Sequence, residues 1–177
     1  MTPVPRPTWR VRDHTLYLFV LIPALAAIIG AAWFLFSTAW WLGAIYLGLL
    51  LGVHLAQARC CVGCPYRGRF CPAIFGVYLA NPLSKLLYPD TPHTKKAYDR
   101  AAAVGISFVT AIALFPLWWL FSAAWWYAVV YLGLLSLHAL VFFPTFCPRC
   151  EYRETCPGGR AYRESTHPDN ADEITGK

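Results

Sequence analysis

Charge is scarce in this sequence, and it is distributed unevenly. Charged residues make up 14% of the 177 residues, whereas hydrophobic residues make up 58%. No Asp, Glu, Lys or Arg occurs between Thr15 and Ala58 or between Ala101 and Pro148, stretches of 44 and 48 residues. Soluble domains contain about 25% charged residues. The composition therefore argues against a water-soluble fold and predicts an integral membrane protein.

Residues that serve several common membrane activities are also missing. The chain has no Walker-type phosphate loop and no Ser, His and Asp set arranged for nucleophilic hydrolysis. Neither charge-free stretch contains a carboxylate, the group that most often carries protons through a membrane. Hydrolysis and proton-coupled transport are therefore not predicted.

Each charge-free stretch is long enough for two membrane helices, because one spanning helix needs roughly 20 apolar residues. With tight turns near Ser37-Thr38 and Ser122-Ala123, the predicted helices are 15–36, 38–58, 101–121 and 123–144. A signal peptide is an alternative for the N-terminus, because arginines precede the first apolar run. That run has no small-residue cleavage boundary and continues into a second span. We therefore expect an all-α membrane protein with four transmembrane helices.

The basic residues indicate how the helices are oriented. All 15 Lys and Arg residues fall in the N-terminal arm, in the 59–100 connector or in the tail from Arg149. The positive-inside rule places this side in the cytoplasm, so both termini are expected to be cytoplasmic, in a bacterial-type inner membrane. The net charge of +6 needs no nucleic-acid partner, since anionic lipid head groups account for it. Aromatic residues predicted to form an interfacial belt surround the two turns: Trp33, Phe34, Phe36, Trp40 and Trp41, and Trp118, Trp119, Phe121, Trp125 and Trp126.

The chain contains an internal repeat. When Trp33–Leu50 is aligned with Trp118–Leu135, 85 positions later, 12 of 18 residues are identical. Each unit holds two spans, so both units begin on the same side of the membrane. We therefore expect two tandem hairpin repeats of parallel topology, related by a pseudo-twofold axis along the membrane normal.

The segments outside the spans complete the predicted organisation. Residues 1–88 form the first repeat, and Pro72–Tyr88 in it is predicted to be an amphipathic helix at the membrane surface, interrupted by Asn81-Pro82. Residues 89–100 form an exposed cytoplasmic connector. The second repeat covers 101–158, and 159–177 is a polar tail expected to be disordered.

Each hairpin ends in a similar cysteine motif. The first is Cys61-x2-Cys64-x6-Cys71-Pro72, and the second is Cys147-x2-Cys150-x5-Cys156-Pro157. A CxxC turn can direct both sulfurs at one metal, as in zinc ribbons and ferredoxins. Disulfides are not expected in the cytoplasm, and arginine-rich polar loops argue against inert burial. We therefore predict metal binding, with thiol–disulfide redox chemistry as an alternative.

The choice between iron–sulfur and zinc depends on the prolines. Cys-Pro occurs at Cys64, Cys71, Cys147 and Cys156, and a proline after a cluster cysteine is typical of ferredoxins. In these loops the chain resembles the membrane polyferredoxin-type proteins of anaerobic respiration, which carry Cys-Pro motifs on cytoplasmic loops after transmembrane helices. Those proteins use a Cys-x3-Cys-Pro element, whereas the spacings here are six and five. The resemblance implies iron–sulfur clusters and electron transfer.

The number of metal sites stays open at this level. Two four-cysteine sites need eight thiolates, and the chain has seven cysteines. Cys60, whose counterpart is Phe146, is a candidate fourth ligand in the first half. The alternative is one shared site built from two CxxC turns, Cys61 and Cys64 with Cys147 and Cys150. Two separate sites are favoured, because the Cys-Pro element recurs in each half.

Two histidines occupy nearly equivalent places in the repeats. His54 and His138 lie near the cytoplasmic ends of the second and fourth predicted helices. Ionisable groups inside spans are candidates for function, so each could support a cysteine site, or both could ligate one haem. They could equally be buried histidines with ordinary hydrogen-bond partners.

Two functions follow from these residues. The first is an iron–sulfur electron-transfer protein, or the electron-transfer subunit of an oxidoreductase, with a soluble or membrane redox partner. The second is a zinc-stapled membrane scaffold that serves in assembly of a larger complex. A membrane dithiol redox protein is the third alternative.

Overall fold

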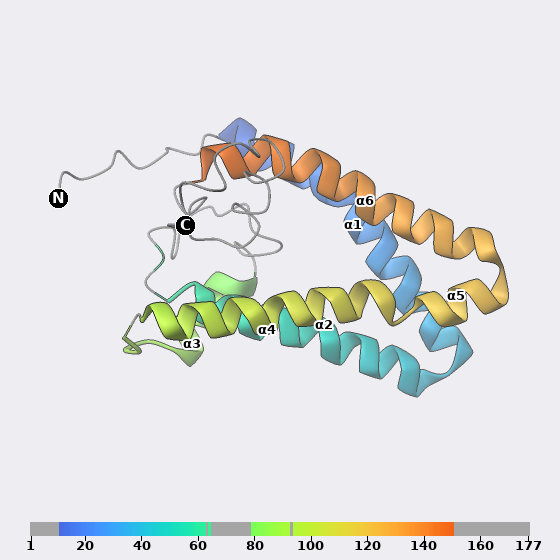
Figure 1. Cartoon of the computed structure of the whole chain (residues 1–177), viewed down its shortest axis with the longest axis horizontal. Helices are drawn as coiled ribbons and strands as arrows, with labels where there is room; N and C mark the ends of the chain where they lie inside the picture. The colour runs from blue at the N-terminus through green and yellow to red at the C-terminus, as the bar shows by residue number, and fades with distance from the viewer. Residues whose placement is uncertain (1–10, 63, 65–78, 93, 151–177) are drawn as a thin grey trace, which may run out of the picture.

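The computed structural model describes residues 11–62, 64, 79–92 and 94–150. This part of the chain is helical and contains no strand. Figure 1 shows the helices running back and forth along one long axis. Their bounds are α1 Val11–Thr38, α2 Trp40–Cys60, α3 Asn81–Leu87, α4 Lys95–Leu114, α5 Leu117–Ala123 and α6 Trp125–Phe146, followed by the short 3₁₀ helix η2 Cys147–Arg149.

Four helical segments are long and apolar enough to cross a membrane. They are Arg12–Thr38, Trp40–Cys60, Lys95–Ala123 and Trp125–Arg149. The prediction of an all-α chain with four potential spans is therefore confirmed. The two cysteine motifs follow α2 and α6, as predicted.

The two hairpin turns lie one to two residues beyond their predicted places. A single extended residue separates the helices in each: Ala39 has φ −161° and ψ 131°, and Ala124 has φ −167° and ψ 129°. Ser37 and Ser122 belong to the preceding helices, and their hydroxyls donate to the carbonyls of Phe34 and Trp118. These hydroxyls satisfy carbonyl oxygens of the last turn, so the helices continue past the serines.

The third span begins earlier than predicted and is broken near its end. α4 starts at Lys95 instead of residue 101, because the Thr94 side chain accepts a hydrogen bond from the Ala97 N–H at 3.3 Å and caps the helix. Half of the predicted 89–100 connector is therefore helical. The break falls at Phe115-Pro116, between α4 and α5.

Pro116 explains that break. A proline has no N–H, so the carbonyl of Ile112, four residues earlier, loses its helical partner. The Tyr131 hydroxyl of α6 donates to this carbonyl at 2.8 Å, within the buried core. A side chain of the second hairpin helix thus replaces the missing backbone donor.

The helices pack as two main pairs joined in a ring. α2 lies along α4, α1 lies along α6, and contacts of α1 with α2 and of α5 with α6 close the ring. Figure 1 shows the α2–α4 pair below the α1–α6 pair. α2 and α6 thus lie diagonally opposite, and Tyr46 and Tyr131 meet between them, their hydroxyl oxygens 3.3 Å apart.

The core is a narrow stripe, and much of the outer surface is apolar. The buried residues of the core include Ala27, Ala31, Leu35, Leu42, Tyr46, Val53, Ile112, Leu120, Ala128 and Tyr131. The predicted belt residues Trp33 and Trp118 are 78% and 75% exposed, and Trp40 and Trp125 are similarly exposed. A bilayer would cover such a surface, whereas water would make it aggregate.

The described part of the predicted surface helix is helical. Residues 72–78 lie outside the described residues, and α3 covers Asn81–Leu87. Pro82 occupies the first turn of α3, where the missing N–H costs nothing, and Leu79 and Ala80 before it are π-helical, so the helix type changes at Asn81-Pro82. α3 packs against α2.

Candidate metal centre

Both CxxC motifs follow directly from the ends of long helices. α2 ends at Cys60 and α6 ends at Phe146, one residue before each motif begins. Figure 1 shows these two helix ends at the same end of the bundle as the start of α1 and of α4. Cys60, Cys61, Cys64, Cys147 and Cys150 are half-buried. Cys71 and Cys156 lie outside the described residues.

The two CxxC motifs adopt the same backbone turn. The Cys64 N–H donates to the Cys61 carbonyl at 3.1 Å, and the Cys150 N–H donates to the Cys147 carbonyl at 3.2 Å. In such an i to i+3 turn, side chains i and i+3 lie on the same side of the backbone. Each turn is therefore suited to present two sulfurs in one direction, as the sequence predicted.

The full ligand sets are not assembled within the described part of the chain. Among residues 11–62, 64, 79–92 and 94–150, no three His, Cys, Asp or Glu side chains gather closely enough to hold a metal. The shared arrangement of Cys61, Cys64, Cys147 and Cys150 is therefore not formed in this structure. Separate sites depend on Cys71 and Cys156 as third ligands, which the described residues do not include.

An ion pair anchors the second motif to the start of the chain's first helix. Arg149, within the second CxxC, donates from its two terminal nitrogens to the two carboxylate oxygens of Asp13, at 2.8 and 3.1 Å. Asp13 is 2% exposed and lies in the first turn of α1. A carboxylate there also interacts favourably with the helix dipole.

Sequence reasoning missed this pair. Asp13 and Arg149 are 136 residues apart, so no spacing rule links them. The available signal was weak: Asp13 is the last acidic residue before the first charge-free stretch, and Arg149 is the first charged residue after the second. Both border the apolar segments on the same predicted side.

Aromatic side chains of α1 and α6 pack together about one turn along the chain from Asp13 and from Arg149. Tyr17 of α1 and Phe146 of α6 meet edge to face, with ring centroids 5.9 Å apart. Both are fully buried, together with Val20 and Leu21. Phe146 occupies the position that matches Cys60 in the first half, so this site of the second half contributes packing where the first half offers a thiol.

The first motif is held by different contacts. Ala58 and Val62, on either side of Cys60 and Cys61, are fully buried. The Arg59 guanidinium lies 5.4 Å from the centre of the Tyr88 ring, which follows α3. The two motifs therefore have different supports, α3 for the first and α1 for the second.

The two predicted histidines are buried and point to different partners. His54 Nδ1 lies 3.3 Å from the side-chain oxygen of Gln57, one turn further along α2. His138 Nδ1 lies 2.8 Å from the Val20 carbonyl of α1, so the ring donates from Nδ1 and its lone pair is on Nε2. Neither belongs to a group of three potential ligands within the described residues.

The Val20 carbonyl that His138 contacts lies three residues before Pro23 of α1. Proline lacks the N–H that would bond to Phe19 and opens the helix over the preceding turn. His138 therefore bonds next to the freed Phe19 carbonyl, whereas Tyr131 bonds directly to the carbonyl that Pro116 frees in α4. This contact fits a structural role for His138, and a metal-bound histidine often uses the same arrangement for its second nitrogen.

The comparisons add no relative to this picture. Neither the protein-family models, nor the curated proteins, nor the solved structures contain a match to the chain. The cysteine turns, the contacts that support them and the apolar helices are therefore the features that indicate function.

Proposed function

We propose that this chain is a membrane-embedded iron–sulfur protein that transfers electrons at the basic face of the membrane. The observation that carries the proposal is the pair of CxxC turns, each closed by the same backbone hydrogen bond, at the ends of α2 and α6 on one end of the bundle. Thiolates that project together from such turns are the ligands of iron–sulfur clusters.

The third cysteines complete the proposed sites. Cys71 and Cys156 follow Cys64 and Cys150 by seven and six residues in the sequence, and each precedes a proline. The first half then has Cys60 as a fourth ligand. The second half has Phe146 at that position and takes its fourth ligand from a histidine, a water or an exogenous group. The sites would differ in stability and in redox potential.

The repeat is proposed to extend to the three-dimensional arrangement. Tyr46 and Tyr131, which meet at the centre, are 85 residues apart, the same offset as in the sequence repeat. The same offset separates the extended residues Ala39 and Ala124. The α2–α4 and α1–α6 contacts are also exchanged by a twofold rotation. These features support two parallel hairpins about a pseudo-twofold axis.

Orientation and partners follow from charge. The arginines and lysines beside the cysteine motifs support a cytoplasmic location for that end and for both termini, in a bacterial-type inner membrane. A soluble donor would reach the clusters there. The acceptor would be a quinone or a partner subunit within the membrane, and the chain would serve as the electron-transfer part of an oxidoreductase.

A zinc-stapled scaffold is the second candidate, favoured by the same turns, because CxxC turns also hold tetrahedral zinc. Purification without oxygen, followed by metal and sulfide analysis and a reduced-minus-oxidised spectrum, separates the two. Iron, acid-labile sulfide and a broad absorbance that bleaches on reduction support the proposal. Colourless protein with stoichiometric zinc contradicts it in favour of the scaffold.

Two further outcomes identify the remaining alternatives. A sharp haem absorbance that disappears in both His54→Ala and His138→Ala would show a haem between α2 and α6. Folded, active protein without stoichiometric metal would contradict both metal functions and support dithiol redox chemistry. A Trp33→Phe variant, altered at the other end of the bundle, controls for general effects of substitution on purification.

A further inference from the structure

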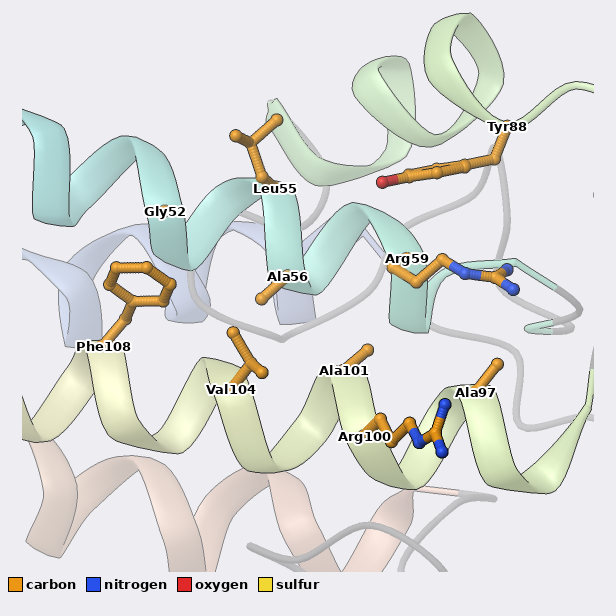
Figure 2. Close-up of a pocket in the computed structure, with 10 residues that line it drawn as sticks. All are labelled: Gly52, Leu55, Ala56, Arg59, Tyr88, Ala97, Arg100, Ala101, Val104 and Phe108. Atoms are coloured by element: carbon orange, nitrogen blue, oxygen red, sulfur yellow. The ribbon is translucent and has the colours of Figure 1, made fainter.

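A hollow between α2 and α4 combines an apolar floor with two arginines at one end. Its volume is about 450 Å³. Gly52, Val104 and Phe108 are part of its apolar lining, and Arg59 and Arg100 lie towards the connector end. Figure 2 shows the two guanidinium groups at that end of the hollow, well away from the Phe108 ring.

Gly52 lets the Phe108 ring of α4 pack directly against α2 beside the hollow. A Cβ at this position would lie 2.6 Å from the Phe108 ring, too close for the ring to stay in place. Leu55 and Val104, on the facing helices, are partly exposed on the outer surface. The hollow therefore opens towards the space that the bilayer fills.

Its polar end is cationic. Asp90 and Asp99 are the nearest carboxylates along the connector, but the described part of the chain shows no ion pair between them and Arg59 or Arg100. The Tyr88 ring lies beside the Arg59 guanidinium, 5.4 Å from ring centre to the guanidinium carbon, and limits where it can point. Two guanidinium groups at the same end of the hollow form a suitable site for a phosphate diester.

The dimensions suit one lipid molecule. Seven residues separate Gly52 from Arg59 on α2, a rise of about 10 Å along the helix. Eight residues separate Arg100 from Phe108, a rise of about 12 Å. An acyl chain can lie along this length while its head group reaches the basic end, where anionic head groups of the leaflet gather.

We propose that the α2–α4 hollow is a binding site for one anionic phospholipid, with the acyl chain against Val104 and Phe108 and the head-group phosphate between Arg59 and Arg100. The second repeat lacks this site. The positions 85 residues from Arg59 and Arg100 are Pro144 and Thr15, so the matching α6–α1 groove carries neither charge. One lipid per chain is therefore expected.

Native mass spectrometry of the full chain tests this proposal. Detergent-purified protein is titrated with phosphatidylglycerol or with phosphatidylcholine of the same acyl chains. Wild-type protein should retain one phosphatidylglycerol with roughly tenfold preference or more, since each of the two arginines near an anionic head group contributes a factor of about five. The double variant Arg59→Gln/Arg100→Gln should lose the preference.

Two matched variants make the result specific. Lys95→Gln/Lys96→Gln removes two exposed charges from the start of α4, outside the hollow, and should retain the preference. Val104→Trp fills the apolar part without a change in charge and should weaken phosphatidylglycerol retention. Equal unfolding midpoints for all variants show that the effects are local.

Several outcomes would overturn the proposal. They are absence of a preference in wild-type protein, an equal loss in the lysine variant, and unchanged retention in Val104→Trp, which would indicate surface charge alone. A quinone that binds in place of the phospholipid and is lost in the arginine variant would show a different ligand class.

Discussion

Tyr46 and Tyr131 occupy matching positions in the two repeats, and their hydroxyl oxygens lie 3.3 Å apart in the buried centre of the bundle. Tyr131 in turn donates to the Ile112 carbonyl at 2.8 Å. The contact joins the two hairpins through one polar chain that ends at the helix break before Pro116. The two tyrosines thus have different structural roles, because Tyr131 donates a hydrogen bond to a backbone carbonyl, whereas the Tyr46 hydroxyl contacts the Tyr131 hydroxyl.

Tyr131→Phe should therefore destabilise the fold more than Tyr46→Phe. The first change leaves the buried Ile112 carbonyl without its donor and should cost about 1–3 kcal/mol, whereas the second removes one hydroxyl contact and should cost about 1 kcal/mol. Unfolding in mixed micelles with increasing denaturing detergent measures both. In a Pro116→Ala background, which restores the backbone N–H, the cost of Tyr131→Phe should fall. An unchanged cost in that background would contradict the argument.

Arg149→Gln should weaken the second cysteine motif selectively. The change removes the two Arg149 hydrogen bonds to the buried Asp13 carboxylate, and the loss of a charged partner at a buried site is costly. We expect a lower unfolding midpoint and loss of metal bound through Cys147 and Cys150, while metal bound through the first motif is retained. The double variant Asp13→Asn/Arg149→Gln should recover part of the stability, because the buried charge is removed as well.

Arg12→Gln is the control for that experiment, since it removes an exposed positive charge one residue from Asp13. It should leave metal content and stability unchanged. If Arg12→Gln had the same effect as Arg149→Gln, total charge at this end of the bundle would be responsible instead of the ion pair.

Cys150→Ser should remove about half of the bound metal, because two separate sites are proposed. Iron and sulfide per chain, measured after anaerobic purification, give the answer. Cys64→Ser is the matched variant in the first half and should also leave about half of the metal bound. Loss of nearly all metal in either variant would show one site shared by the two hairpins.

The turns at Ala39 and Ala124 should face away from the cytoplasm. Reporter proteins fused after Thr38 and after Ala123 should show periplasmic activity, because the basic residues lie at the opposite end of every span. A fusion in the connector after Asp90 is the control and should show cytoplasmic activity. The reverse pattern would overturn the orientation and would make disulfides between the cysteines reasonable.

The four long apolar helices and the CxxC turns could be predicted from the sequence because each depends on local information. A membrane helix needs about 20 apolar residues in a row, and a CxxC turn involves only four residues. The hairpin turns were predicted within two residues for the same reason. Ser37 and Ser122 nevertheless belong to the preceding helices, where their hydroxyls donate to backbone carbonyls.

The contacts between helices could not be predicted in this way, because they depend on which helices become neighbours. Asp13 meets Arg149 only since α1 lies along α6, and Tyr131 reaches Ile112 only since Pro116 exposes a carbonyl that faces it. The hollow with Arg59 and Arg100 exists only where α2 packs on α4. Hydrophobicity along the chain sets how many helices cross the membrane, whereas side-chain shape and buried hydrogen bonds select the partner of each helix.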